Sequence, residues 1–245
     1  MDVVIVTGAA GGIGSVYVEG LAKAGYAVVA ADLQAPEQLA ARINAGGGSV
    51  LAVAVDVSDR ASTEAMAAKV EKSLGRIDGL VNNAAYYSAI VKKDFTELTD
   101  QEWDQCFAVN VRGAWLCTRA VVSAMKRQGR GKIVNIASMT VPTAPPGFAH
   151  YIASKAAIIG LTRALARELG TDRICVNTLS PDYIAFDRDY DNRQPQMRQM
   201  LTAQRCIGRD ETPDDLLGTL LYLLGSGSDF VTGQDIWVNG GRAFR

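Results

Sequence analysis

Short runs of apolar, β-branched residues recur along the chain and alternate with helical patterns. These runs lack regular polar alternation, which is typical of strands buried on both faces of a parallel sheet. Crossovers between parallel strands are right-handed, so the pattern predicts an α/β chain, a doubly wound Rossmann sheet with helices on both faces. The seven predicted strands span residues 2–8, 27–32, 50–57, 79–85, 132–138, 174–181 and 235–241.

Helical patterns fill most of the intervals between these strands. The first runs through Leu21 and Ala24, and the others cover residues 63–74, 103–128, 151–169 and 213–224. The polar stretch 182–210 departs from this alternation, with Pro195 in its middle and a weak helical run over residues 197–204. We expect this stretch to form a lid over the functional site.

Composition limits the class of protein and its partners. With 245 residues, 48% of them hydrophobic, the chain can form one domain, residues 1–245. Lys and Arg total 25 against 26 Asp and Glu, without long blocks of either sign, so we expect small-molecule partners and neither nucleic acid nor membrane. The first predicted strand begins at Asp2 and no apolar stretch approaches ~20 residues, so we expect a cytoplasmic protein.

Metal and thiol chemistry are not expected. The four cysteines lie far apart without a C-x-x-C pair, which argues against disulfides and a zinc knuckle. His150 is the only histidine, so a histidine-rich metal site is impossible. A Ser–His–Asp hydrolase would have to use this histidine without a G-x-S-x-G motif.

A glycine-rich turn, TGAAGGIG over residues 7–14, joins the first predicted strand to the first helix. Backbone N–H groups and the helix dipole favour a pyrophosphate there, and side chains would block its approach. The absence of a following Gly-Lys-Ser/Thr excludes a P-loop. Many such turns use glycine only for positive φ, so the surrounding sequence has to decide whether a nucleotide binds.

Asp32 ends the second predicted strand, close to the roughly 20-residue offset at which a carboxylate accepts hydrogen bonds from the adenosine ribose. The carboxylate would repel a 2′-phosphate, and neither Gly11 nor Leu33 supplies a cation for one. The cofactor predicted from these residues is NAD rather than NADP. A role for Asp32 as a turn or capping residue remains the alternative.

Four polar residues form a candidate catalytic group. Tyr151 and Lys155 are spaced i, i+4 and therefore share one helix face. A neighbouring ammonium and a cationic nicotinamide would favour the phenolate, so Tyr151 could take or give an alcohol proton. Ser138 would hydrogen-bond the substrate oxygen, and Asn110 could hold a water that links Lys155 to solvent.

In these motifs the sequence resembles the short-chain dehydrogenase/reductase family. TGAAGGIG matches the family's TGxxxGxG, and NNAA at residues 82–85 nearly matches NNAG. Asn110, Ser138, Tyr151 and Lys155 match the family's catalytic tetrad in order and spacing. The resemblance extends from Val3 to Gly241.

The resemblance implies a set of cofactor contacts and an assembly. The implied contacts are Gly8, Gly12, Ile13, Gly14, Asp32, Leu33, Asp56, Val57, Asn83, Ala84, Tyr151, Lys155, Pro181 and Ile184. Family members are often tetramers built through the helices around Asn110 and Tyr151 and through the C-terminal segment, so we expect a homotetramer or a homodimer.

Two positions depart from the family pattern. Pro181-Asp182 replaces the usual Pro-Gly after the sixth strand, and Asp182 could contact the substrate. Phe186 lies near the place where the family has a threonine that holds the carboxamide.

The expected function is an NAD-dependent interconversion of a secondary alcohol and a ketone by hydride transfer. Apolar and aromatic residues in the loops after the strands suggest a small cyclic or aromatic substrate. The candidate substrate contacts are Tyr86, Met139, His150 and Tyr183. The alternatives are an NADPH-dependent carbonyl reductase and a nucleotide-binding sensor without catalysis.

Overall fold

The protein contains one seven-stranded, fully parallel sheet with the order β3-β2-β1-β4-β5-β6-β7. A computed structural model describes residues 1–184 and 195–244. This topology confirms the predicted doubly wound sheet. The strands are β1 Val3–Thr7, β2 Ala27–Asp32, β3 Ser49–Ala54, β4 Gly79–Asn82, β5 Gly131–Ile136, β6 Ile174–Pro181 and β7 Asp235–Val238.

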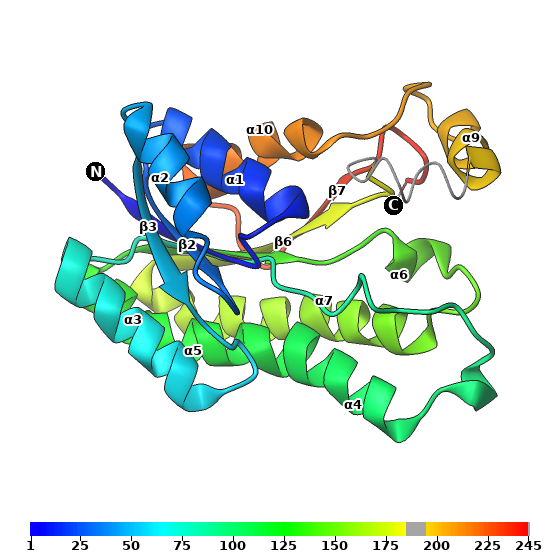
Figure 1. Cartoon of the computed structure of the whole chain (residues 1–245), viewed down its shortest axis with the longest axis horizontal. Helices are drawn as coiled ribbons and strands as arrows, with labels where there is room; N and C mark the ends of the chain where they lie inside the picture. Colours follow the sequence, from blue (N-terminus) through cyan, green and yellow to red (C-terminus); the bar gives the residue numbers. More distant parts are fainter. Residues whose placement is uncertain (185–194, 245) are drawn as a thin grey trace.

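Helices cover both faces of the sheet (Figure 1). On one face lie α1 Gly12–Lys23, α2 Glu37–Ala45 and α10 Pro213–Leu224, and on the other α3 Arg60–Leu74, α5 Ala114–Gln128 and α7 Ala149–Leu169. Alternate residues of the same strand enter two separate cores, as Val4 and Ile5 of β1 show. Both faces of the strand are thus buried, which explains why the runs read as continuously apolar.

The helix predicted over residues 103–128 is present, but it is not a single regular α-helix. It consists of α4 Asp100–Phe107, the π-helical turn η2 Ala108–Gly113 and α5. Thr99 caps α4 through a capping box with Glu102. A single-turn π-helix widens the helix by one residue and occurs often at functional sites.

Two further helices were not expected from the sequence. In helix α2 only Ala40 is fully buried, so the sequence of this helix has a weak apolar pattern. Helix α6, Thr140–Thr143, has a single turn. Helix α9, Pro195–Ala203, corresponds to the weak helical run predicted over residues 197–204 and begins at Pro195. The strand predicted at 79–85 ends at Asn82, because its pairing with β5 ends at the Asn82–Asn135 register.

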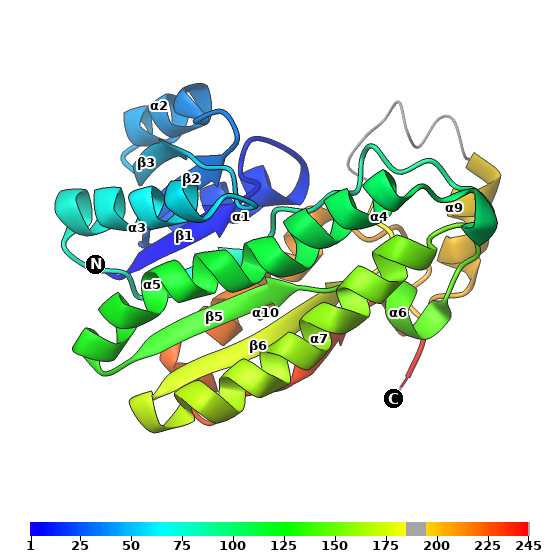
Figure 2. The ribbon, with the colours of Figure 1, turned by 90° about the horizontal axis from the view of Figure 1, so that it is seen from below.

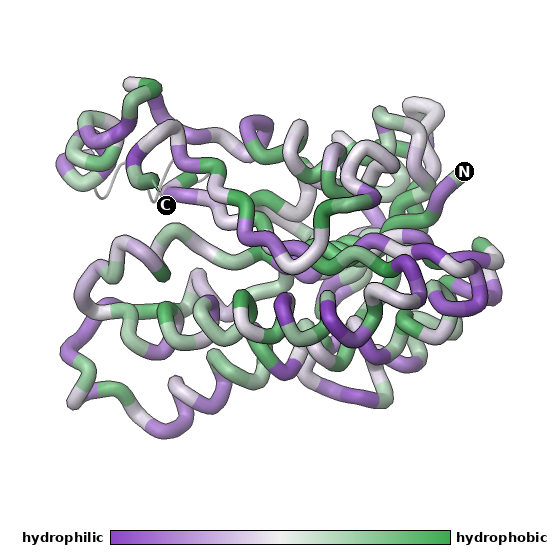
Figure 3. Tube along the Cα trace, turned by 180° about the vertical axis from the view of Figure 1, so that it is seen from behind, coloured by the Kyte–Doolittle hydropathy of each residue, from purple (hydrophilic) through white to green (hydrophobic). Residues whose placement is uncertain are grey.

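The short segments α6 and α9 and the C-terminus lie beyond the carboxyl ends of the central strands (Figure 2). Hydrophobic residues concentrate along the strands, and hydrophilic residues along the outer helices and loops (Figure 3). Ten residues of the expected lid, 185–194, lie outside the described residues, and Phe186 is one of them. Within the described ranges, no helix is long and apolar enough to cross a membrane.

Candidate active site

The glycine-rich turn leads from β1 directly into α1. Gly8 and Gly12 have φ of 67° and 54°, a region that L side chains rarely adopt. A methyl group on Gly14 would lie 2.0 Å from the Gly8 carbonyl oxygen, so any larger residue there would force the backbone to shift. Helix α1 has no side-chain hydrogen bond at its N-cap, Gly11, which has open space around its Cα. The turn therefore offers backbone N–H groups without obstruction, which fits a pyrophosphate.

Asp32, at the end of β2, closes one side of this turn. Its carboxylate accepts hydrogen bonds from the Ala10 N–H at 2.8 Å and from the Leu33 N–H at 2.7 Å. The Leu33 side chain beside it is 71% exposed. The Asp32 carboxylate therefore stabilises a turn, which was the alternative role considered from the sequence. It also remains at the surface, where a ribose could contact it.

Thr7 and Asn83 hold the glycine turn against the end of β4. The Thr7 hydroxyl accepts hydrogen bonds from the N–H groups of Asn83 and Ala84, each at 3.1 Å. The Asn83 side-chain amide donates to the carbonyls of Thr7 and Gly8 at 2.9 and 3.0 Å. These bonds fix the spacing between the first and fourth strands at the edge where a dinucleotide binds in such folds.

All the expected cofactor contacts among the described residues lie at this edge. Asp56 and Val57 follow β3, Ala84 follows β4, and Pro181 and Ile184 lie at and after the end of β6. Asp56 accepts hydrogen bonds from the N–H and hydroxyl of Ser58, at 2.8 and 2.7 Å. Val57 packs against Gly113, where a methyl group would lie 2.9 Å from its Cγ2.

Ser138, Tyr151 and Lys155 meet between β5 and α7. Ser138 follows β5, and its hydroxyl accepts hydrogen bonds from the N–H and hydroxyl of Thr140 at 3.1 and 3.0 Å. The Lys155 ammonium donates to the Ile136 carbonyl at 2.7 Å and lies 5.6 Å from the Tyr151 ring centroid. All three side chains are buried. The i, i+4 spacing therefore places phenol and ammonium together, as predicted.

Burial shifts the pKa values of this pair in opposite directions. Desolvation raises the pKa of Tyr151, and the nearby Tyr87 phenol raises it further, while a hydrogen bond with Ser138 acts against both. Desolvation lowers the pKa of Lys155 to about 8. Burial therefore favours the protonated phenol of Tyr151, an effect opposite to the one expected from the ammonium and a bound nicotinamide.

Asn110 occupies the π-helical turn η2 and turns its amide toward α7. Its Nδ2 donates to the Ser154 hydroxyl at 3.0 Å, and its Oδ1 accepts from the Tyr86 N–H at 2.6 Å. Ser154 in turn donates to the Tyr151 carbonyl at 2.7 Å. Asn110 is thus tied both to the helix that carries Tyr151 and to the loop after β4.

A network of side-chain hydrogen bonds lies beneath the site and supports it. The Asn82 amide donates to Asn135 at 2.8 Å, and Asn135 donates to the Thr162 hydroxyl at 2.8 Å. All three residues are buried. These bonds connect β4, β5 and α7, and so fix the spacing of the elements that carry the candidate catalytic side chains.

Aromatic side chains surround the Tyr151 phenol. The rings of Tyr87 and Tyr151 lie 5.1 Å apart between centroids, and Phe148 lies 6.3 Å from Tyr151. Tyr86 and Ile90 pack against the same cluster. The loop after β4 therefore presents an apolar wall beside Tyr151.

The expected substrate contacts have different surroundings. His150 is buried, its Nδ1 lacks a hydrogen-bond partner among the described residues, and burial lowers its pKa. Met139 is buried behind Ser138, where its Sδ lies 3.7 Å from the Asn239 amide. Tyr183 accepts a hydrogen bond from Arg205 through its carbonyl oxygen. Tyr86 remains partly exposed beside Asn110.

The expectation that Asp182 contacts the substrate is wrong for this structure. Its carboxylate is buried and forms ion pairs with Arg205 and Arg242. A buried carboxylate with two guanidinium partners has its hydrogen-bonding capacity taken up by the protein itself.

Sequence reasoning missed Ser154 and the two arginines. Ser154 follows Tyr151 by three residues and so lies on the same helix face, a signal that was present. Arg205 and Arg242 lie 23 and 60 residues from Asp182. Nothing local in the sequence indicates such distant partners.

The fold and the site together define a dinucleotide-binding oxidoreductase that acts on CH–OH groups. Among the described residues, no cluster of His, Cys, Asp and Glu could hold a metal ion.

The family model described as enoyl-(acyl carrier protein) reductase matches residues 8–243. The chain belongs to the short-chain dehydrogenase/reductase family.

Several known proteins are similar to this chain over nearly its whole length. The (2S)-[(R)-hydroxy(phenyl)methyl]succinyl-CoA dehydrogenase subunit BbsD of Thauera aromatica is 37% identical, over 98% of this chain and 96% of its own. The 2-dehydro-3-deoxy-D-gluconate 5-dehydrogenase of Dickeya dadantii is 34% identical, over 98% and 94%. A putative NAD(P) dependent gluconate 5-dehydrogenase from Beutenbergia cavernae, solved with bound NADP at low occupancy, superposes with a TM-score of 0.90 at 34% identity, over 98% and 96%.

Proposed function

We propose that the protein is an NAD-dependent dehydrogenase that interconverts a secondary alcohol and a ketone on a small cyclic or aromatic substrate. The observation that carries this proposal is the meeting of Ser138, Tyr151 and Lys155 at the edge where the glycine turn opens. An acid–base group and a dinucleotide cradle on one sheet edge are the parts that such a reaction needs.

The residues at the sheet edge fit a dinucleotide. The N–H groups at the start of α1 would hold the pyrophosphate, and Asp32 would accept hydrogen bonds from the adenosine ribose. Asp56 and Val57 would lie beside the adenine, with Lys155 and Pro181 toward the nicotinamide. When bound, the nicotinamide supplies the acceptor or donor of hydride.

Each catalytic side chain has one task in this proposal. During oxidation Tyr151 takes the alcohol proton, and during reduction it returns a proton to the carbonyl oxygen. Ser138 donates a hydrogen bond to the same oxygen as negative charge develops on it. The Lys155 ammonium stabilises the phenolate, and Asn110 holds the loop after β4 in place through the Tyr86 N–H.

The aromatic wall supports the proposed substrate class. Tyr86, Tyr87 and Phe148 present rings beside the reacting phenol, and flat apolar rings favour cyclic or aromatic ligands over polyols. The named substrate of the Thauera aromatica relative carries a phenyl group beside its hydroxyl. We further propose that the stretch 182–210 covers this substrate, and that the enzyme works as a cytoplasmic homotetramer.

A reductase that uses NADPH is a second candidate, because the Beutenbergia cavernae structure contains NADP. Asp32 argues against it, since a carboxylate repels a 2′-phosphate and the neighbouring Leu33 offers no cation to compensate. The two candidates differ in one measurable property, the ratio of kcat/KM for the two cofactors.

The test measures absorbance of reduced nicotinamide with NAD or NADP against cyclic, aromatic, sugar and steroid alcohols. We expect turnover with NAD, and a loss on the order of 10²–10⁴ in kcat for Tyr151→Phe, the usual contribution of a general acid or base. Tyr222→Phe, on the outer surface of α10, is the matched control and should keep full activity. Unchanged turnover in Tyr151→Phe would contradict the proposed mechanism, and a preference for NADP would favour the second candidate.

A further inference from the structure

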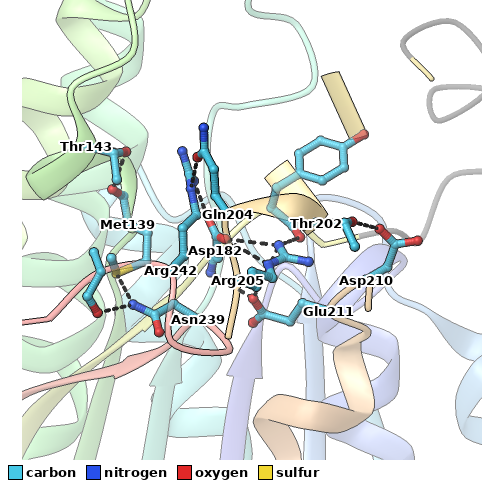
Figure 4. A network of polar contacts seen from close by, with 12 residues as sticks. Met139, Thr143, Asp182, Thr202, Gln204, Arg205, Asp210, Glu211, Asn239 and Arg242 are labelled. Carbon is cyan, nitrogen blue, oxygen red and sulfur yellow. Dashed lines mark hydrogen bonds and ion pairs between the residues drawn. The ribbon is translucent and has the colours of Figure 1, made fainter. Parts of the chain in front are cut away.

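Asp182 forms a buried ionic cluster directly after β6 (Figure 4). Its Oδ2 accepts hydrogen bonds from Nε and Nη2 of Arg205 at 3.1 and 3.0 Å, and its Oδ1 accepts from Nη1 of Arg242 at 2.6 Å. The side chains of Asp182 and Arg205 are 2% and 1% exposed. Charges at this depth are stable only with close, well-aligned partners.

The segment 181–184 is held at every residue. The Pro181 carbonyl accepts from the Met139 N–H at 2.9 Å, and the Asp182 N–H donates to Glu211 at 3.2 Å. The Tyr183 carbonyl accepts from Arg205 Nη2 at 2.7 Å, and Ile184 pairs with Glu211 through an isolated β-bridge. Because Met139 follows Ser138, the same bonds connect this segment to the catalytic serine.

A tight C-terminal turn places Arg242 on this cluster. Gly240 and Gly241 have φ of 60° and 78°, and a methyl group on Gly241 would lie 2.8 Å from Cβ of Cys206. The Gly240 carbonyl accepts from the Ile207 N–H at 2.9 Å. The turn is therefore fixed to the segment after α9, and it has little freedom to move Arg242 away.

The same turn reaches the loop that carries Ser138. The Asn239 amide donates to the Ala243 carbonyl at 2.9 Å and lies 3.7 Å from Sδ of Met139. Arg242 also donates to Gln204 at 3.1 Å. Three segments far apart in sequence, 181–184, 204–211 and 239–243, thus form one connected unit that borders the catalytic serine (Figure 4).

We infer that Arg205 and Arg242 are positioning residues which act through Asp182 to fix the segment 181–184 beside the nicotinamide end of the cofactor site. The inference rests on the proposed function, because it assigns that end of the site to a nicotinamide. Neither arginine touches the reacting atoms. Each neutralises the buried carboxylate of Asp182, whose backbone is part of the segment 181–184. Losing Arg242 leaves Asp182 with one cation in place of two. This loosens the segment 181–184, while Arg205 still holds the fold.

The test compares binding of NADH with binding of ADP-ribose, which has the adenosine and both phosphates but no nicotinamide. We expect Arg242→Gln to raise the Kd for NADH roughly fivefold or more, the size usual for residues that couple to a site without contacting the ligand. The Kd for ADP-ribose should remain within about twofold, since the glycine turn and Asp32 are unchanged. Arg242→Lys keeps a cation and should restore most of the affinity for NADH.

Arg209→Gln is the matched control. Arg209 lies in the same segment and forms a two-bond ion pair with Asp215, but its side chain is exposed and does not contact Asp182. We expect wild-type affinities for both ligands in this variant. A second readout, amide hydrogen exchange without ligand, should show faster exchange at Met139 and Asp182 in Arg242→Gln alone.

The outcomes separate this inference from the proposed function. If the wild type binds neither NADH nor ADP-ribose, the proposed function fails and the inference fails with it. If the wild type binds both, and Arg242→Gln binds both as the wild type does, only the inference is overturned. If Arg242→Gln binds NADH and ADP-ribose more weakly by the same factor, the variant has a general loss of structure. That result would also overturn the inference.

Discussion

At the scale of single residues, burial controls the chemistry of the site. Tyr151 and Lys155 are both buried, so each is shifted toward its neutral form. The pKa of Lys155 falls to about 8, so its ammonium persists at neutral pH. The pKa of Tyr151 rises, so the phenol holds its proton at neutral pH and is prepared to act as an acid.

This distribution of protons predicts different pH dependences for the two directions of reaction. Oxidation needs the deprotonated phenol, so its kcat/KM should rise as the pH increases from 6 to 8, approaching tenfold per pH unit. Reduction needs the protonated phenol, so it should change little over this range. Steady-state kinetics in both directions would test this, and an oxidation rate that falls between pH 6 and 8 would contradict it.

Glu211 is a second buried acid, at the edge of the Asp182 cluster. Its Oε1 has no hydrogen-bond partner among the described residues, and the Tyr17 hydroxyl likewise has none. Burial, followed by the negative charge of Asp182, raises the pKa of Glu211 to about 8. The folded protein therefore keeps a proton on Glu211 at a pH where the unfolded chain has already lost it.

The sign of the resulting stability change follows from this difference. Between pH 4.5 and about 8 the unfolded state binds fewer protons at Glu211 than the folded state, so this group lowers stability as pH rises through that window. Glu211→Gln cannot ionise, and its urea midpoint should therefore fall less than the wild type's between pH 5 and pH 9. Glu64→Gln, at an exposed position on α3, is the control that should follow the wild type.

At the scale of elements, two local departures from regular structure create the site. The turn between β1 and α1 brings Gly14 against Gly8, so that backbone approaches backbone without a side chain between them. The π-helical turn η2 inserts one residue between α4 and α5 and directs Asn110 toward Ser154. Both departures lie at the carboxyl edge of the sheet, where the ends of several strands meet.

The glycine turn allows a matched pair of substitutions. Gly14→Ala places a methyl group 2.0 Å from the Gly8 carbonyl oxygen, and the required shift should lower stability by about 1–3 kcal/mol, the usual cost of overpacking. At Gly11 nothing lies within 4 Å of an added methyl group, and the backbone is extended with φ of −164°. Gly11→Ala should therefore unfold at the wild-type urea concentration. Equal midpoints for the two variants would contradict the close contact.

At the scale of the whole molecule, the sheet order brings distant parts of the chain to one edge. β1 pairs with both β2 and β4, so the glycine turn lies between Asp32 and Asn83. β6 lies between β5 and β7, so the C-terminal turn meets the segment after β6. A hollow of about 350 Å³ beside β7 is lined by Trp237 and Phe244, among others.

The proposed tetramer should bury aromatic residues that the single chain leaves exposed. Trp115 on α5 is 38% exposed, between the guanidinium groups of Arg60 and Arg119. We expect sedimentation velocity to show four copies, and Trp115→Glu to reduce this number because it would bury a charge in the interface. Tyr222→Glu, on α10 at the opposite face of the sheet, should keep the wild-type assembly. A monomeric wild type would contradict the proposal.

The sequence by itself determined the layers of the fold, the glycine turn and the spacing of Tyr151 and Lys155. These features depend on residues within one strand, turn or helix, so local periodicity predicts them. Only the tertiary structure decided the π-helical turn, the pKa shifts and the environment of Asp182. Each of these arises from burial and from partners up to 60 residues away, and burial is a property of the packed chain rather than of any segment.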